Sequence, residues 1–195
     1  MLITLFLPGF YISVATFHQE MIPTELALSI ASAKQGVPFP TFVEVLIMLM
    51  SFEILLEAGL RLPKNIGSAV SIVGGIIVGQ AAVEARFISP AVVVVIALTA
   101  IADFAMTNQD FSYALRLTRF LIAIISSVFG LFGLSIGALL LLYHLSTIVS
   151  FGVPYLAAFT NDEGQKIIDT VVSFPVKFFK KRPIELNTEN KTRQK

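Results

Sequence analysis

Four carboxylates lie inside apolar stretches of the chain, where an ionisable side chain is the clearest candidate for a chemical role. They are Glu44, Glu53, Glu57 and Asp103. Glu53 and Glu57 stand four residues apart and share one helix face, whereas Glu44 falls on roughly the opposite side. A charge in mid-membrane costs roughly 2.5–3.5 kcal/mol. We therefore expect Glu53 and Glu57 to face protein or water.

Small residues form a ladder along one face of residues 65–83. The ladder consists of Gly67, Ser71, Gly75 and Gly79. This spacing lets another backbone approach closely, which is a main source of helix association in membranes. We expect this face to pack against a neighbouring helix, and Gly133 and Gly137 to form a second packing face of the same kind.

The opposite side of the same segment changes from apolar to polar. Its residues form one stripe, which consists of Val70, Val73, Ile77, Gln80 and Glu84. Such a row suits the wall of an ion pore, where an apolar constriction excludes water and a carboxylate near the mouth favours cations. It equally suits a helix whose apolar side chains touch lipid while Glu84 reaches the interface. The row alone leaves both interpretations open.

Motifs of catalysis and metal binding are missing. The chain has no cysteine, and its two histidines, His18 and His144, are far apart in the sequence. The phosphate-binding patterns GxxxxGK[ST] and GxGxxG and the nucleophile pattern GxSxG do not occur. We expect no enzymatic activity, no metal, no cofactor and no nucleic-acid partner.

The elements that position these residues are apolar helices. Residues 120–149 form an apolar run in which His144 is the only side chain that can gain a charge near neutral pH. This run is longer than the roughly 20 apolar residues that a membrane-spanning helix requires. Charged residues make up 14% of the chain, against about 25% in soluble domains. The predicted fold class is all-α, a polytopic integral membrane helical bundle with four to five spanning or re-entrant helices.

The sequence predicts a break in the first N-terminal helix and an N-cap at the start of the second. Residues 1–17 are apolar but contain Pro8 in their middle, which predicts a kinked or broken helix. Residues 24–34 fit a short helix with Thr24 as its N-cap.

Two further segments carry the carboxylates. Residues 41–58 are interrupted by their glutamates, and form either an interfacial or re-entrant helix or a true span. Residues 89–106 form another span with Asp103 near its end, and we expect Asp103 to pair with Arg116 or Arg119.

The basic residues gather at the C-terminus. Eight of the 14 Lys and Arg residues lie in residues 160–195, which predicts a cytoplasmic tail able to touch anionic lipid headgroups, after a transmembrane helical domain of residues 1–159.

Several runs of the sequence carry a family resemblance. They are LPGFYISVATFHQEMIPTELALSIASAKQGVPFP, FEILLEAGLRLPKNIGSAVSIVGGIIVGQAAVEA, ALTAIADFAM and SFGVPYLAAF. Over nearly all of residues 1–160 the chain resembles the A-subunit family of spore germinant receptors, the GerA family. Those subunits look longer, with a soluble region before the membrane part, so the chain resembles their C-terminal membrane half. The related SpoVAF proteins share the same motifs, so such a paralogue fits as well.

The resemblance implies a multi-pass protein of the spore inner membrane that acts in germination. A subunits of the family are thought to form a ring, a pentamer, that conducts monovalent cations. A transporter-like B subunit is taken to sense the nutrient, and the C subunit is a lipoprotein. The family helix that bears QAAVEA corresponds to residues 65–85, which adds weight to the pore interpretation of that segment.

Two other function classes remain open at this point. A secondary transporter would account for a broken first helix and for carboxylates inside the membrane. A non-conducting scaffold for a nutrient-sensing subunit would need only the glycine ladders. A cation current without substrate, substrate-coupled flux, or neither, would separate the channel, the transporter and the scaffold.

Overall fold

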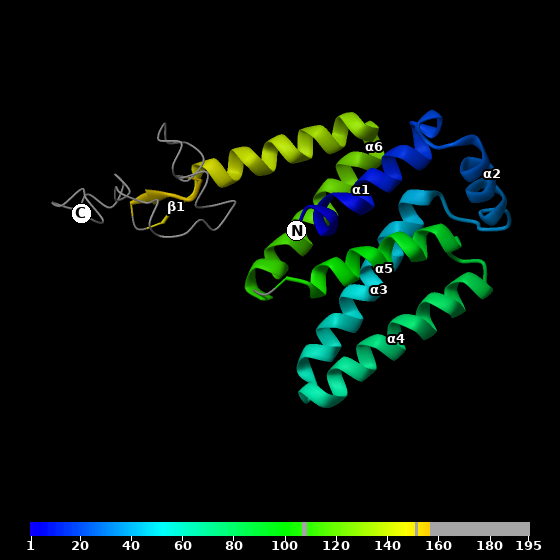
Figure 1. Cartoon of the computed structure of the whole chain (residues 1–195), viewed down its shortest axis with the longest axis horizontal. Helices are drawn as coiled ribbons and strands as arrows, with labels where there is room; N and C mark the ends of the chain where they lie inside the picture. The colour runs from blue at the N-terminus through cyan, green and yellow to red at the C-terminus, as the bar shows by residue number, and fades with distance from the viewer. Residues whose placement is uncertain (107–108, 151, 157–195) are drawn as a thin grey trace, which may run out of the picture. The chain divides into compact units, whose positions relative to one another are not determined.

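The computed structural model describes residues 1–106, 109–150 and 152–156, and most of these residues are helical (Figure 1). The chain divides into two units, Met1–Ala138 and Leu139–Lys195, each described by itself. The helices are α1 (Leu2–Thr16), the short 3₁₀ helix η1 (Gln19–Met21), α2 (Thr24–Ala33), α3 (Thr41–Arg61), α4 (Lys64–Glu84), α5 (Pro90–Phe104) and α6 (Gln109–Thr147). The prediction of a helical chain is confirmed for the described residues, apart from two very short strands.

Those strands belong to the second unit. β1 (Val149–Ser150) pairs antiparallel with β2 (Val153–Pro154), with Val149 opposite Pro154. The Tyr155 N–H donates to the carbonyl of Ile148 at 2.8 Å and closes the turn. The predicted boundary between residues 159 and 160, and the basic tail beyond it, lie outside the described residues.

The two N-terminal expectations need correction. α1 runs as one helix through Pro8, so the alternative of a broken helix is wrong. A proline inside a helix removes its own N–H from the ladder and crowds the carbonyl four residues earlier, and the burial of Pro8 and Gly9 in the unit offsets this cost. Thr24 is the first residue of α2 and makes no capping hydrogen bond, because Pro23 occupies the N-cap position.

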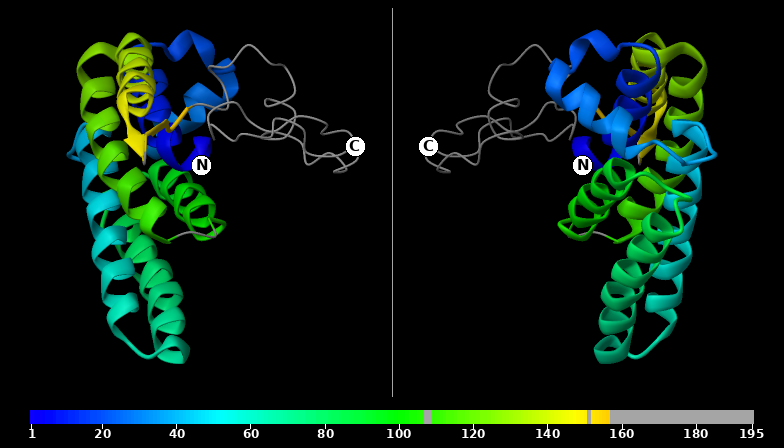
Figure 2. Two further views of the ribbon diagram at one scale, coloured as in Figure 1. Left: turned by 90° about the vertical axis from the view of Figure 1, so that its left-hand side faces the viewer. Right: turned by 90° about the vertical axis from the view of Figure 1, so that its right-hand side faces the viewer.

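Helices α3 and α4 form an antiparallel hairpin. They lie side by side along most of their length, with Pro63 between them (Figure 2). Proline is pre-organised for the start of a helix, since its missing N–H would have no partner there. α3 contains the whole predicted segment 41–58, and α4 matches the predicted 65–83 to within one residue at each end.

The core of the first unit lies where α1, α3, α5 and the first part of α6 meet. Its fully or almost fully buried residues are Ile12, Val45, Met48, Leu49, Ile88, Val92, Ile96 and Ala123. They recur at helical spacing on α3 (45, 48, 49) and on α5 (92, 96), which gives each helix one buried face. This core fixes α3 and α5, and therefore the charged residues that they carry.

Helix α6 is broken at Gly130, where φ is 63° and ψ is −142°. Only glycine adopts such a conformation without strain. In a straight helix, Ile122 and Gly137 would stand about 22 Å apart. Here a Cβ added to Gly137 would lie 3.1 Å from Ile122 Cγ1, so residues 131–138 fold back on the part of α6 before Gly130. The expectation of one continuous span over residues 120–149 is therefore wrong.

By length and composition, Phe111–Thr147 is the one helical segment among the described residues that could cross a membrane, and Gly130 divides it into two helices. It supports membrane association. α1 and α5 are apolar but have 15 residues each, or about 22 Å, against the roughly 30 Å of a hydrocarbon core. The number of spans stays a prediction.

Candidate functional site

The glycine face of α4 is turned towards α3 and α5. A Cβ on Gly67 would overlap the carbonyl oxygen of Gly59 in α3. A Cβ on Gly75 would lie 3.4 Å from the Phe52 ring, and one on Gly79 would lie 3.3 Å from Val93 in α5. The backbones come closest at Gly67, where there is no side chain that could move aside.

One residue of this contact was missed by the ladder pattern. Gly74, one position before Gly75, lies under Leu55 of α3, and a Cβ there would stand 2.7 Å from Leu55 Cδ2. The signal was present in the sequence, because Gly74 and Gly75 are adjacent. The side chain of Ser71 lies outside the described side chains.

The predicted stripe of residues 70, 73, 77, 80 and 84 lies on α4 and is called the α4 stripe, and its last three members are exposed. Ile77 keeps 58% of its surface, and Gln80 and Glu84 are also exposed. The side chains of Val70 and Val73 are outside those that the structure describes. Ile77, Gln80 and Glu84 follow one another at helical spacing, so they form one row that runs from apolar to anionic towards the end of α4.

A buried ion network joins α3, α5 and α6. Arg116 is its centre: its Nη1 donates to Glu53 Oε1 and its Nε donates to Asp103 Oδ2, both at 3.0 Å. Ser112 Oγ donates to the other oxygen of Asp103 at 2.7 Å. Arg119 Nη2 lies 3.4 Å from Glu53 Oε2. The predicted pairing of Asp103 with Arg116 is confirmed.

The network is balanced in charge, and apart from Glu53, which is 26% exposed, its charged side chains are largely shielded from solvent. Two arginines face two carboxylates, and the side chains of Asp103, Arg119 and Arg116 are 2%, 3% and 12% exposed. The Tyr113 ring lies 5.0 Å from the Arg116 guanidinium and covers it further. Buried charges are tolerated when they are paired and hydrogen-bonded, so each member depends on the others. The network ties three helices together.

The two glutamates that share a face of α3 have different surroundings. Glu53 contacts Arg116 and Arg119 inside the unit, whereas Glu57 is half exposed and pairs with Arg61 at 3.0 Å on the same helix. Both outcomes agree with the expectation that these carboxylates face protein or water.

Glu44, on the other side of α3, is fully buried. Its Oε2 accepts the Ser89 N–H at 2.7 Å, and its Oε1 lies 3.4 Å from Lys34 Nζ. Through these contacts Glu44 connects α3 to the start of α5 and to the end of α2. Lys34 could not be predicted as its partner from the sequence, because the two residues lie in different elements.

The second glycine pair packs within α6. A Cβ on Gly133 would overlap the carbonyl oxygen of Ile125, and Gly137 faces Ile122. Both contacts join the halves on either side of Gly130. Among the side chains that the structure describes, no group of three or more His, Asp or Glu is placed to hold a metal ion.

Comparison of the sequence with known proteins identifies relatives of this chain. Residues 1–185 match the GerA family, described as Bacillus/Clostridium GerA spore germination protein. Spore germination protein KA of Bacillus subtilis (strain 168) is 46% identical over 192 residues, which cover 98% of this chain and 35% of KA. Spore germination protein B1 of the same organism is 40% identical, covering 100% and 40%. No solved structure matches the chain.

A relative from another organism agrees. Spore germination protein XA of Bacillus anthracis is 38% identical over 193 residues, which cover 99% of this chain and 39% of XA. The chain thus spans well under half the length of these relatives. With a family match over most of its residues, the chain belongs to the GerA family of spore germination proteins.

Proposed function

We propose that the chain is the membrane part of a germinant-receptor subunit, and that α4 lines a pathway for monovalent cations in a ring of such subunits. The names of the relatives supply the process, spore germination. The observation that carries the pathway is the exposed end of the α4 stripe, formed by Ile77, Gln80 and Glu84, opposite a face packed against α3 and α5.

The polar end of the stripe favours water. A carboxylate in hydrocarbon costs roughly 2.5–3.5 kcal/mol, so Glu84 is stabilised by an aqueous mouth. In a ring of α4 helices, Ile77 would form an apolar narrowing about 10 Å along the axis from Glu84. Such a narrowing excludes water and blocks ions until it widens, and a carboxylate ring beside it attracts cations.

The ring is proposed to be a pentamer in the spore inner membrane, beside a transporter-like B subunit that senses the nutrient and a lipoprotein C subunit. The first unit has apolar surface for lipid or for such neighbours. Ile101 and Phe104 of α5 are each 64% exposed, and Phe132 of α6 is 69% exposed.

Replacing Glu84 by lysine should lower cation release. A ring of carboxylates raises the local cation concentration by about tenfold or more, and a ring of ammonium groups reverses the sign. We expect Glu84→Lys in the intact receptor to slow nutrient-triggered monovalent-cation release from spores by about tenfold. Glu25→Lys is the matched control, because Glu25 is also exposed but lies on α2. It should leave release near wild type.

Equal release by Glu84→Lys and wild type, at equal protein levels, would contradict the pathway. Flux in purified vesicles that requires a co-transported solute would instead identify a transporter. Absence of any flux from vesicles that hold the assembled, nutrient-binding complex would identify a scaffold.

A further inference from the structure

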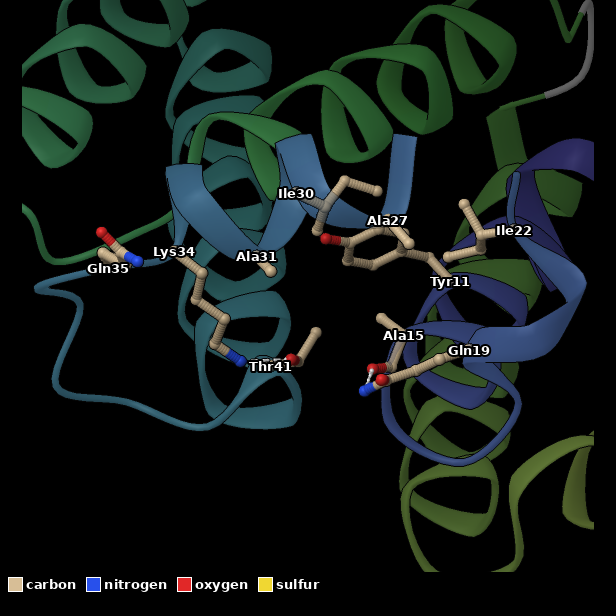
Figure 3. A pocket seen from close by; sticks show the side chains of 10 residues that line it. All are labelled: Tyr11, Ala15, Gln19, Ile22, Ala27, Ile30, Ala31, Lys34, Gln35 and Thr41. Carbon is tan, nitrogen blue, oxygen red and sulfur yellow. Dashed lines mark hydrogen bonds between the residues drawn. The ribbon is translucent and has the colours of Figure 1, made fainter. Parts of the chain in front are cut away.

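A pocket of about 340 Å³ lies between α1, η1, α2 and the start of α3 (Figure 3). It is separate from the α4 stripe and from the ion network. Its volume is at the lower end of the 300–1,000 Å³ typical of small-molecule sites. Neither the glycine pattern nor the positions of the carboxylates predicts this pocket, because its walls come from four elements.

One wall of the pocket is apolar. Ala27, Ile30 and Ala31 line it from α2, the Tyr11 ring lines it from α1, and Ile22 closes one end (Figure 3). The alanines leave open the space that larger side chains would fill. This wall suits a short hydrocarbon body.

The polar residues of the lining are Gln19, Lys34, Gln35 and Thr41, of which Lys34 and Thr41 contact one another. Lys34 Nζ donates to Thr41 Oγ1 at 2.5 Å and lies 3.4 Å from Glu44 Oε1. An ammonium has three N–H groups, so one is left for the pocket. Among the described residues the Thr41 hydroxyl has no acceptor for its proton. Two donors are therefore available beside the apolar wall.

The charge of this side is already balanced. Glu44 is 0% exposed and cannot move into water, so it holds the Lys34 ammonium as its counter-ion. A ligand anion would compete with Glu44 for the same ammonium and would lie near a second carboxylate. A ligand cation would face an ammonium. A neutral acceptor oxygen neither competes with Glu44 as a second anion nor is repelled by the Lys34 ammonium.

We propose that this pocket binds an uncharged amphiphile, in which a hydrogen-bond-accepting oxygen meets Lys34 and Thr41 and a short hydrocarbon body lies on the α2 wall. Two sources offer this chemistry: a glycerolipid ester carbonyl with the start of its acyl chain, and a free small alcohol. The site is independent of ion conduction by α4.

Photolabelling of the intact protein tests the site. One sample receives a short diazirine-bearing alkanol, and another is reconstituted in phosphatidylglycerol vesicles that contain a diazirine-bearing phospholipid. Labelled peptides are then mapped by mass spectrometry. We expect label on residues 24–35 from one probe or both, and the probe that labels identifies the source.

Ala27→Phe fills the pocket, and Ala33→Phe is its matched control, because Ala33 is exposed on the same helix but does not line the pocket. We expect Ala27→Phe to lower labelling of α2 by about tenfold, the equivalent of a loss of ~1.4 kcal/mol of binding. Ala33→Phe should not change it. Excess hexan-1-ol should compete with the alkanol probe in the wild type, a readout that needs no variant to fold.

A paired variant tests the polar side. Lys34→Met with Glu44→Gln removes both charges together, and it should weaken labelling while the protein stays assembled. The proposal is overturned if neither probe labels α2 above exposed apolar surfaces such as Ile101, or if Ala27→Phe and Ala33→Phe label alike.

Discussion

Arg116→Met is expected to destabilise the first unit by about 3–5 kcal/mol, which is much of the stability of a typical domain. The substitution keeps an unbranched apolar stem but removes the guanidinium that donates to Glu53 and Asp103. Asp103 is 2% exposed, so it would be left charged without its main partner. The measurement is the midpoint of thermal unfolding of the purified intact protein in detergent.

A second substitution shows whether charge pairing is the cause. Asp103→Asn combined with Arg116→Met leaves Glu53 facing Arg119, and therefore restores neutrality. The double variant should be more stable than Arg116→Met alone. Glu57→Gln is the control on α3: its pair with Arg61 is solvent-exposed, so the loss should stay below about 1 kcal/mol. A double variant as unstable as the sum of the two single variants would contradict the network.

Gly67→Ala should destabilise the α3–α4 hairpin, whereas Gly75→Ala should be tolerated. At Gly67 the new methyl group meets the carbonyl oxygen of Gly59, and overpacking of this kind costs about 1–3 kcal/mol. At Gly75 it meets the Phe52 ring at 3.4 Å, an ordinary contact. Alanine is also more favourable than glycine in a helix by about 0.8–1.0 kcal/mol. Gly75→Ala should therefore leave the free energy of unfolding unchanged or raise it.

The comparison is made by thermal unfolding and by the yield of assembled receptor. Both substitutions are identical in chemistry and lie on the same face of α4, so helix propensity cancels between them. If Gly67→Ala and Gly75→Ala unfold at the same temperature, the backbone contact between α3 and α4 is not as close as the structure has it.

Local features of the fold could be predicted from the sequence. The bounds of α4 and its two faces follow from residues spaced three and four apart, a periodicity that a single helix contains in full. The pairing of Asp103 with Arg116 was also within reach, because the two residues are separated by one short connection.

Side-chain contacts between elements that lie far apart in the sequence could not be predicted. Arg116 reaches Glu53 across 63 positions of sequence, and Lys34 reaches Glu44 from a different helix. The reversal at Gly130 was missed for another reason: the count of apolar residues is the same for one long helix and for two helices that fold back. A glycine in that run permits the break but does not require it.

If the exposed face of α4 lines an ion pathway, substitutions on that face must change the conductance of the assembled complex. Ile77→Ala is compared with Ile101→Ala, since the two isoleucines are similarly exposed, at 58% and 64%, but lie on α4 and α5. Each intact receptor complex is reconstituted in a planar bilayer and recorded without nutrient. We expect a cation leak for Ile77→Ala and no current for Ile101→Ala and the wild type. A complex that assembles with Ile77→Ala yet stays silent, or leaks equally with Ile101→Ala, would contradict it.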